Sequence, residues 1–323
     1  MDAFAAGPAA GTILITGGTG SLGYRAAEAV LESAPDAQVV ITGRGADRAA
    51  AAARRLGDRA IGMPLDLSSL DDVRRFAGEF MAREELPPLR AVVCNAGVQI
   101  VSGTALTVDG FEETFAVNHL AHLLLVRELL PAVADAGRIV FVASDTHDPT
   151  KPTGMPDPAY TTARDLAHPV DDGTSSPGAV GRHRYTTSKL CNVLATYELA
   201  RQLDSASDGR RITVNAFDPG LMPGTGLGRD YPGVQGLAWR YLMPALTVVP
   251  GINVHTPRQS GRALARLVVD PDLAVVTGKY FSGRRQIRSS ADSYDIAKAQ
   301  DLWTTSIELI EGRDRSGGSA GGA

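Results

Sequence analysis

The feature that most constrains this chain is a glycine turn between a short apolar run and a helical stretch near the N-terminus. The run is residues 11–16, the turn is Gly17-Gly-Thr-Gly-Ser-Leu-Gly23, and residues 24–33 have alanine-rich helical spacing. Strand, glycine turn and helix in this order are the setting of a dinucleotide fingerprint. The glycines let the backbone approach a pyrophosphate, and the helix N-terminus offers it unpaired N–H groups. We therefore expect a nucleotide site here, with a plain turn as the alternative.

Short apolar runs alternate with helical stretches along most of the chain. Strand-like runs follow the first one at 38–42, 60–67, 90–94, 137–143 and 211–217. This alternation predicts an α/β fold, with a Rossmann-like doubly wound parallel sheet in a single domain. Ligands of such sheets bind beyond the carboxyl ends of the strands, so residues at those ends are expected to share one crevice. These residues are Gly17, Arg44, Asp66, Asn95 and Ser144.

We expect a flexible N-terminus over 1–10, one domain over 11–311 and a disordered tail over 312–323. Two segments of the domain lack clear periodicity. The first, 145–184, is rich in Pro, Gly, Asp and Thr, and an irregular segment of this length is uncommon unless it is functional. We expect it to shape the substrate pocket. The second, 221–257, is apolar and predicts either a lid for an apolar ligand or a core-packing helical pair.

Charge and cysteine content exclude several classes of function. A net charge of -4 without a basic stripe argues against nucleic acid as a partner. Cys94 and Cys191 lie in apolar runs, so we interpret them as buried free thiols, and the histidines show no metal-ligand spacing. No apolar stretch is long enough to span a membrane and no basic residues open an N-terminal signal. We therefore expect a cytoplasmic protein.

Two strand ends predict contacts with a dinucleotide. The residue that closes the second strand of such units contacts the adenosine ribose, where an arginine favours a 2′-phosphate. Arg44 therefore favours NADP(H) over NAD(H), and the alternative is a surface arginine in a turn. The small residues Asn95-Ala-Gly97 would let the chain pass beneath a cofactor. Ser68 is expected to cap the helix that follows the third strand.

Candidate catalytic side chains lie on two predicted helices and one strand end. Tyr185-Thr-Thr-Ser-Lys189 opens a helical run, and a spacing of four places the phenol and the ammonium on one face. A solvated helix face is the alternative. Asn118 lies on the apolar face of a helix predicted over 111–133. An amide there usually satisfies backbone groups, and an active-site role is the other option.

Together these residues resemble the short-chain dehydrogenase/reductase family over residues 11–310. After Tyr185 the chain looks most similar to the protochlorophyllide reductase and retinol dehydrogenase branch. Two positions depart from the family pattern. Ser21 stands where most members with this active site have glycine, and Ala143 replaces the first of a common serine pair. The matching motifs, in family order, are the glycine turn, Asp66, Asn95-Ala-Gly97, Asn118, Ser144, Tyr185-x-x-x-Lys189 and Pro219-Gly220, and the branch is carried by Ser188-Lys-Leu-Cys-Asn192, Pro219-Gly-Leu-Met-Pro-Gly-Thr-Gly-Leu227 and Asp270-Pro-Asp-Leu273.

The resemblance implies roles for these residues. Tyr185 would donate a proton and Lys189 would bond the nicotinamide ribose. Ser144 would hold a carbonyl oxygen, and Asn118 would bind a water that links Lys189 to solvent. The cofactor-binding set would be Thr16, Gly17, Gly20, Ser21, Leu22, Gly23, Arg44, Asp66, Leu67, Asn95, Ala96, Gly97, Tyr185, Lys189, Pro219 and Gly220.

The chemistry expected of this set is hydride transfer coupled to proton transfer. A ketone that accepts hydride develops negative charge on its oxygen and needs a proton, but a free phenol titrates near pH 10. A cation about 4 Å away favours the phenolate by up to ~4 kcal/mol at an effective dielectric near 20, so Lys189 is sufficient to activate Tyr185.

We therefore expect an NADP(H)-dependent oxidoreductase that reduces a carbonyl on a bulky apolar small molecule or oxidises the matching alcohol. Two alternatives stay open: reduction of a conjugated C=C bond, and a non-catalytic NADP(H)-binding scaffold or sensor. The resemblance also allows a homodimer or homotetramer.

Overall fold

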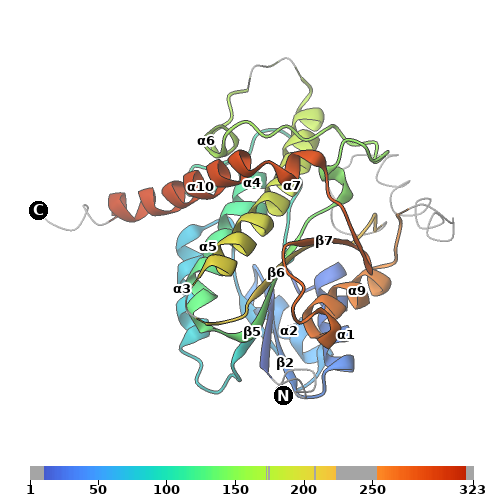
Figure 1. The fold of residues 1–323 in the computed structure, drawn as a ribbon. Coiled ribbons are helices and arrows are strands. Elements are labelled where there is room, and N and C mark those ends of the chain that lie inside the picture. The colour runs from blue at the N-terminus through green and yellow to red at the C-terminus, as the bar shows by residue number, and fades with distance from the viewer. Residues whose placement is uncertain (1–10, 172, 174, 207–208, 223–252, 318–323) are drawn as a thin grey trace, which may run out of the picture.

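The computed structural model describes residues 11–171, 173, 175–206, 209–222 and 253–317 (Figure 1). They form one eight-stranded sheet in the order β3-β2-β1-β4-β5-β6-β7-β8. All neighbouring strands are parallel except the last pair, β7 and β8. This is the doubly wound α/β sheet that the sequence predicts. The strands are β1 Gly11–Ile15, β2 Ala37–Gly43, β3 Ala60–Pro64, β4 Leu89–Cys94, β5 Val133–Val142, β6 Thr213–Asp218, β7 Lys279–Ser282 and β8 Arg285–Ile287.

Helices cover both faces of the sheet, and strand alternation divides the core between them. Ile13 and Ile15 of β1 pack on the side of α1, α2 and α9, while Leu14 packs on the side of α3, α5 and α7 (Figure 1). This follows from the two-residue period of a strand. Within the described residues, no helix is long and apolar enough to cross a bilayer. The α-helices are α1 Ser21–Ser33, α2 Ala46–Leu56, α3 Leu70–Met81, α4 Glu113–Phe115, α5 Ala121–Leu129, α6 Ala163–Ala167, α7 Pro177–Ser205, α9 Pro257–Val269 and α10 Ile296–Gly317.

The helix predicted over 111–133 is interrupted, and this matters for the site. It consists of α4, a π-helical turn over Ala116–Leu120, α5 and a final 3-10 turn, and Val133 already belongs to β5. The π-helical turn contains Asn118. Such turns occur mostly as single insertions in α-helices and are frequent at functional sites.

The helix that carries Tyr185 begins earlier than predicted. Helix α7 starts at Pro177, and the Ser176 hydroxyl accepts a hydrogen bond from the backbone N–H of Ala179. Serine at the N-cap followed by proline is a strong start signal, but residues 178–184 contain only two apolar side chains, Ala179 and Val180, and so show no apolar helical period. The segment 145–184 is therefore only partly irregular, since it also contains α6.

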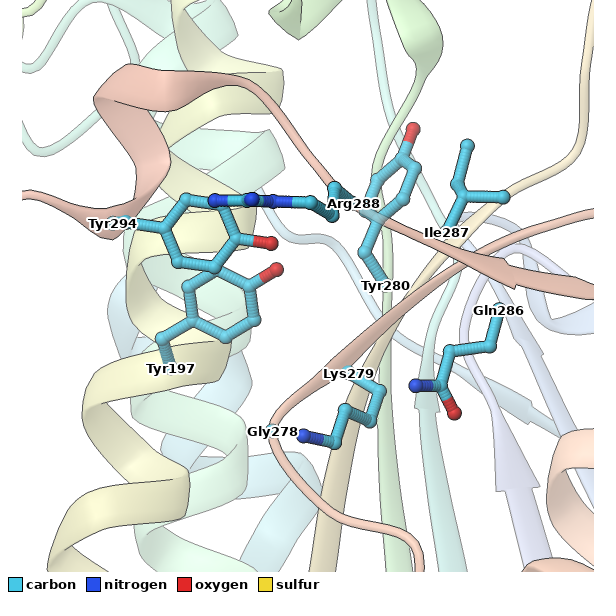
Figure 2. Close-up of a pocket in the computed structure, with 8 residues that line it drawn as sticks. All are labelled: Tyr197, Gly278, Lys279, Tyr280, Gln286, Ile287, Arg288 and Tyr294. Carbon is cyan, nitrogen blue, oxygen red and sulfur yellow. The ribbon is translucent and has the colours of Figure 1, made fainter.

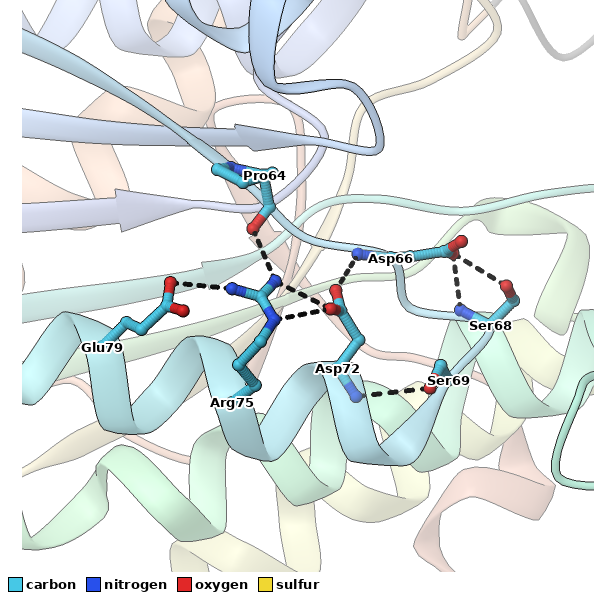
Figure 3. Close-up of polar contacts among 7 residues, drawn as sticks. All are labelled: Pro64, Asp66, Ser68, Ser69, Asp72, Arg75 and Glu79. Atoms are coloured by element: carbon cyan, nitrogen blue, oxygen red, sulfur yellow. Dashed lines mark hydrogen bonds and ion pairs between the residues drawn. The ribbon is translucent and has the colours of Figure 1, made fainter.

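Ser69, rather than Ser68, caps α3. The Ser69 hydroxyl accepts from the N–H of Asp72 at 3.3 Å, while the Ser68 hydroxyl donates to Asp66 Oδ1 at 2.7 Å (Figure 3). Asp72 Oδ2 in turn accepts from the N–H of Asp66 at 2.7 Å. The prediction chose the wrong one of two adjacent serines because Asp66 draws Ser68 into the preceding turn.

Two features near the C-terminus differ from expectation. A short edge strand, β8, returns antiparallel to β7 through a turn in which Gly283 has φ +54°. Its three residues are mostly polar and give no strand signal. Helix α10 continues through Gly317, so the disordered tail predicted over 312–323 is wrong for residues 312–317. The lid or helical pair predicted over 221–257 falls almost entirely on 223–252, which lie outside the described residues.

The residues on either side of 223–252 lie next to each other at the carboxyl end of β6. Leu221 and Val254 form a parallel bridge. The N–H of Leu221 donates to the carbonyl of Asn253 at 2.8 Å, and the N–H of His255 donates to the carbonyl of Leu221 at 2.9 Å. The chain therefore leaves and returns to the sheet at one point, just beyond β6.

Candidate active site

The glycines of the first turn serve different purposes. Gly17 has φ +66°, and a Cβ there would lie 3.0 Å from Ala96. At Gly23 a Cβ would lie 2.6 Å from Asn95 Nδ2. At Gly20, directly before α1, a Cβ would meet nothing within 4 Å. Gly17 and Gly23 thus let the turn pack against the end of β4, while Gly20 borders open space at the helix N-terminus, where a phosphate group can approach.

Thr16 and Asn95 fasten this turn to β4. The fully buried Thr16 hydroxyl accepts from the N–H of Asn95 at 2.9 Å and from that of Ala96 at 3.0 Å. Asn95 Nδ2 donates to the carbonyl of Thr16 at 2.7 Å. Both side chains, predicted to bind a cofactor, are thus engaged in shaping the turn. His122 Nε2 lies 2.9 Å from the Thr16 hydroxyl, a link that the sequence did not indicate.

Ser21 has φ 51°, in the left-handed region that favours glycine. We expect Ser21→Gly to raise the free energy of unfolding by about 0.5–1 kcal/mol, because an L-residue pays roughly 1–2 kcal/mol in that conformation and glycine returns part of this as backbone entropy. Urea denaturation measures the change. Ser33→Gly, at the other end of α1 and in ordinary helical structure, is the matched control and should destabilise. Equal destabilisation by both variants would contradict the strain at Ser21.

Tyr185 and Lys189 lie together inside the protein. The two residues are 8% and 4% exposed, and Lys189 Nζ lies 5.4 Å from the centre of the Tyr185 ring. Nζ donates to the carbonyl of Val142, at the end of β5, at 3.1 Å. Burial lowers the pKa of Lys189 to about 8, and the carboxylate of Asp218 opposes this shift. The lysine is thus a buried cation at neutral pH, held against a phenol.

Asn118 joins the loop after β4 to helix α7. Its Oδ1 accepts from the N–H of Val98 at 2.8 Å, and its Nδ2 donates to the Val98 carbonyl and to the Ser188 hydroxyl, both at 3.0 Å. The side chain therefore satisfies backbone groups, as one of the two interpretations of the sequence held. Its place beside the lysine is also clear, since a Cβ on Gly97 would lie 3.2 Å from Asn118 Oδ1 and 3.6 Å from Lys189 Nζ.

His122 continues the contacts of Asn118 toward the nucleotide turn. Its Nδ1 lies 3.2 Å from the carbonyl of Asn118 and its Nε2 reaches Thr16. Burial lowers the pKa of His122 to about 4, so the ring is neutral. A neutral ring with Nδ1–H as donor and Nε2 as acceptor of the Thr16 hydroxyl satisfies both contacts.

Ser144 lies at the end of β5, as predicted, and begins a 3-10 turn over Asp145–His147. Its hydroxyl accepts from the N–H of Thr146 at 3.3 Å and points toward Asp145 Oδ1 at 3.4 Å. Both contacts are long, so the hydroxyl is free to turn to a stronger partner. Burial and the neighbouring Asp218 raise the pKa of Asp145.

Asp218 closes β6 and was not selected from the sequence. Its buried carboxylate accepts from Gly220 N–H at 2.8 Å, Asn253 Nδ2 at 2.9 Å and Ser282 Oγ at 2.8 Å. Gly220 has φ +71°, and a Cβ there would lie 2.8 Å from Asn253 Oδ1. These contacts fix the Pro219-Gly220 turn at the edge of the crevice. The only signal in the sequence was an acid at the end of a buried strand.

The end of β2 is open and basic. Arg44 and, one helical turn later, Arg48 are exposed, and neither forms an ion pair or hydrogen bond to another described residue. Asp66, predicted to bind the cofactor, turns its Oδ1 to the N–H and hydroxyl of Ser68 (Figure 3). The neighbouring Leu67 is buried.

A cavity of about 430 Å³ lies on the edge of the sheet, away from the residues described above. Tyr197 of α7 stacks with Tyr294 on one side, where the guanidinium of Arg288 lies over the Tyr294 ring, and Tyr280 lies across from them (Figure 2). Tyr197 follows Tyr185 by three helical turns, or about 18 Å at 1.5 Å per residue. No described residue of the segment 145–184 lines this cavity, so the described part of that segment does not form its wall.

The site therefore gathers its parts at the carboxyl ends of β1, β2, β4, β5 and β6. The model of the short chain dehydrogenase family matches residues 11–163. Protochlorophyllide reductase B of Oryza sativa subsp. japonica is 32% identical over 93% of this chain and 77% of its own length. Human polyprenol dehydrogenase is 29% identical over 92% of this chain and 84% of its own. The crystal structure of the angucycline C-6 ketoreductase LanV with bound NADP superposes with a TM-score of 0.60 at 24% identity, covering 86% of this chain and 96% of that one.

Proposed function

We propose a specific reaction for this chain, which belongs to the short-chain dehydrogenase/reductase family near its protochlorophyllide reductase and retinol dehydrogenase branch. Members of this family are oxidoreductases that use a nicotinamide cofactor, and so is this protein. The proposed reaction is reduction of a carbonyl group with NADPH or oxidation of the matching alcohol. The observation that carries the proposal is the buried Tyr185 and Lys189 pair, with Nζ 5.4 Å from the ring centre. Asn118 of the π-helical turn donates to Ser188 on the same helix, and Ser144 follows β5, whose Val142 carbonyl accepts from Lys189.

The residues present suit the cofactor. Gly20 leaves space at the N-terminus of α1, where unpaired N–H groups attract a phosphate. Arg44 is exposed without a described partner at the position expected for the adenosine ribose. When bound, the nicotinamide supplies or accepts a hydride. Thr16, Asn95 and Asp66 act through the shape of their turns.

Each catalytic side chain has one task in this proposal. Tyr185 delivers the proton from its phenolic oxygen to the carbonyl oxygen of the substrate. The ammonium of Lys189 stabilises the phenolate that remains, at a distance from the ring at which cations and aromatic rings attract. The Ser144 hydroxyl turns from Asp145 to donate to the same carbonyl oxygen. Asn118 holds the loop beneath the reaction and keeps Gly97 close to Lys189.

We propose a bulky apolar small molecule as the substrate. Two relatives support this class by their names, since one acts on a polyprenol and LanV on an angucycline ketone. A panel of apolar aryl and polycyclic ketones, assayed by the loss of NADPH absorbance, tests the proposal. If NADPH binds but no member of the panel is reduced and no matching alcohol is oxidised, the non-catalytic scaffold becomes the better description. A homodimer or homotetramer stays a prediction.

The cofactor preference depends on Arg44. We expect Arg44→Asp to weaken NADPH binding by about 10- to 150-fold, because a charge-assisted contact to the 2′-phosphate contributes roughly 1.5–3 kcal/mol. NADH binding should be unchanged or tighter, since an acid at this position suits a free 2′-hydroxyl. Fluorescence titration with both reduced cofactors measures the two affinities.

Arg54→Asp is the matched control, because Arg54 is an exposed arginine at the far end of α2. It should leave both affinities within a factor of about 2, as exposed charges farther apart than a Debye length are largely screened. If the wild-type protein binds NADH more tightly than NADPH, the preference for NADP(H) is wrong.

A second candidate is reduction of a conjugated C=C bond, favoured by the identity to protochlorophyllide reductases. Reduction of an α,β-unsaturated ketone with 4-deuterated NADPH separates the two. Deuterium on the carbinol carbon supports carbonyl reduction. Deuterium on the β-carbon with the ketone retained supports the alternative.

A further inference from the structure

Asp218 is a buried acid beside the proposed catalytic lysine. Its carboxylate is completely buried and receives three hydrogen bonds, from Gly220 N–H, Asn253 Nδ2 and Ser282 Oγ, at 2.8–2.9 Å. All three partners are donors, which suits a carboxylate that carries its charge. A buried charge of this kind needs a partner of opposite sign, because desolvation penalises it otherwise.

Lys189 lies one strand away. Its Nζ donates to the carbonyl of Val142, and Val142 pairs with Phe217, the residue before Asp218. The carboxylate of Asp218 acts on Lys189 by raising its pKa, against the larger lowering by burial. Asp218 is the one acid with such an effect on Lys189 among the described residues.

The other titratable groups around Lys189 do not carry a compensating charge. On its own helix the neighbour is the Tyr185 phenol, and from α5 it is His122, whose pKa burial lowers to about 4. Beside Asp218 stand Asp145 and His147 of the 3-10 turn and Tyr280 of β7. Burial lowers the pKa of His147 and raises that of Tyr280.

Asp145 is the other acid that could supply a negative charge near Lys189. It shares the donor of Asp218, since Asn253 Nδ2 lies 3.0 Å from Asp145 Oδ2. Burial and then Asp218 raise the pKa of Asp145, and its remaining side-chain contact is the 3.4 Å one to Ser144. Of the two acids, Asp145 has the raised pKa and only one further side-chain contact, whereas the carboxylate of Asp218 accepts hydrogen bonds from three donors.

We propose that Asp218 is the counter-ion of Lys189, a positioning residue that keeps the lysine protonated and thereby keeps Tyr185 able to transfer its proton. The expected effect on kinetics rests on the proposed function. The electrostatic pairing of Asp218 with Lys189 is independent of that function. Asp218 touches neither substrate nor reacting atoms, and it acts through Lys189 and the turn at Gly220.

The first test is the pH profile of Asp218→Asn. Without the carboxylate the pKa of Lys189 should fall below about 8, so the alkaline fall of kcat for ketone reduction should move about one pH unit or more toward acid. For a shift of one unit kcat at pH 8 should then drop about 5-fold, while at pH 6 it should stay close to that of wild type. Asp145→Asn removes the other acid of the pair and should leave the alkaline limb in place. A shift with Asp145→Asn and none with Asp218→Asn would overturn the assignment.

The second test does not need a substrate. Asp218→Asn should lower the melting temperature of the wild-type protein, but raise it in a Lys189→Met background, because there it removes a buried carboxylate that has lost its partner. Equal effects in both backgrounds would overturn the pairing. If Tyr185→Phe keeps full activity while this thermal coupling is present, the proposed mechanism fails and the coupling of the two charges stands.

Discussion

Replacement of Tyr185 by phenylalanine is expected to lower kcat for ketone reduction by about 1,000-fold while the affinity for NADPH changes by less than about 3-fold. General acid catalysis contributes roughly 10²–10⁴-fold, and phenylalanine removes only the proton donor. The ring stays buried beside Lys189, so the packing of α7 is retained. Steady-state kinetics on the ketone that wild type reduces fastest, with fluorescence titration of NADPH, measure both quantities.

Tyr197→Phe provides the matched control. Tyr197 lies on the same helix, is equally buried, and its hydroxyl is 2.6 Å from Ser289 Oγ rather than in the crevice. Its kcat should stay within a factor of about 3 of wild type, since the lost hydrogen bond costs stability rather than chemistry. Full activity of Tyr185→Phe would show that the proton comes from another group.

The second large effect is expected on stability. Gly181→Ala should destabilise the protein by about 3 kcal/mol or more, because a Cβ at Gly181 would lie 1.8 Å from the carbonyl oxygen of Ile100. Neither partner is a flexible side chain, so helix α7 must move away from the loop after β4. That displacement also disturbs Tyr185, one turn further along the helix. Chemical denaturation and the ketone assay should therefore both register the change.

Gly178→Ala, in the first turn of the same helix, is the control. A Cβ there would lie 3.5 Å from Arg182 Nη1, an ordinary contact. Alanine should stabilise the helix by up to about 1 kcal/mol, since glycine is the poorer helix former. If both variants change stability in the same direction and by similar amounts, contact with the Ile100 carbonyl is not the reason that position 181 requires glycine.

The sheet was predictable because its strands appear in the sequence as continuous apolar runs. Strands buried on both faces need such runs, as in Val92, Val93 and Cys94 of β4, and the order of strands and helices then determines that the carboxyl ends share one edge. This placed Ser144, Asn95 and Arg44 correctly at strand ends. The four-residue spacing of Tyr185 and Lys189 similarly fixed their shared helix face.

The sequence did not predict details for which neighbouring residues offer alternatives of similar free energy, or which depend on contacts between distant parts of the chain. Ser68 and Ser69 are both good caps, and the hydrogen bonds of Asp66 and Asp72 decide between them. The π-helical turn at Asn118 has no sequence signature, because it inserts one residue without changing the apolar pattern. Asp218 looks like any acid after a strand until Asn253, far along the chain, is seen to bind it.

The bridge between Leu221 and Val254 holds the two ends of the intervening chain side by side. Since both ends are fixed side by side, the separation that an insert must span stays the same whatever its length. Doubling the length of a closed loop costs only about 0.6 kcal/mol, so inserts of different size and composition can be spliced here while Asp218 and the strand ends keep their places. We therefore expect family members to differ in the length of the chain between the positions of Leu221 and Val254. Exchange of this segment between two relatives should leave the rest of the fold unchanged.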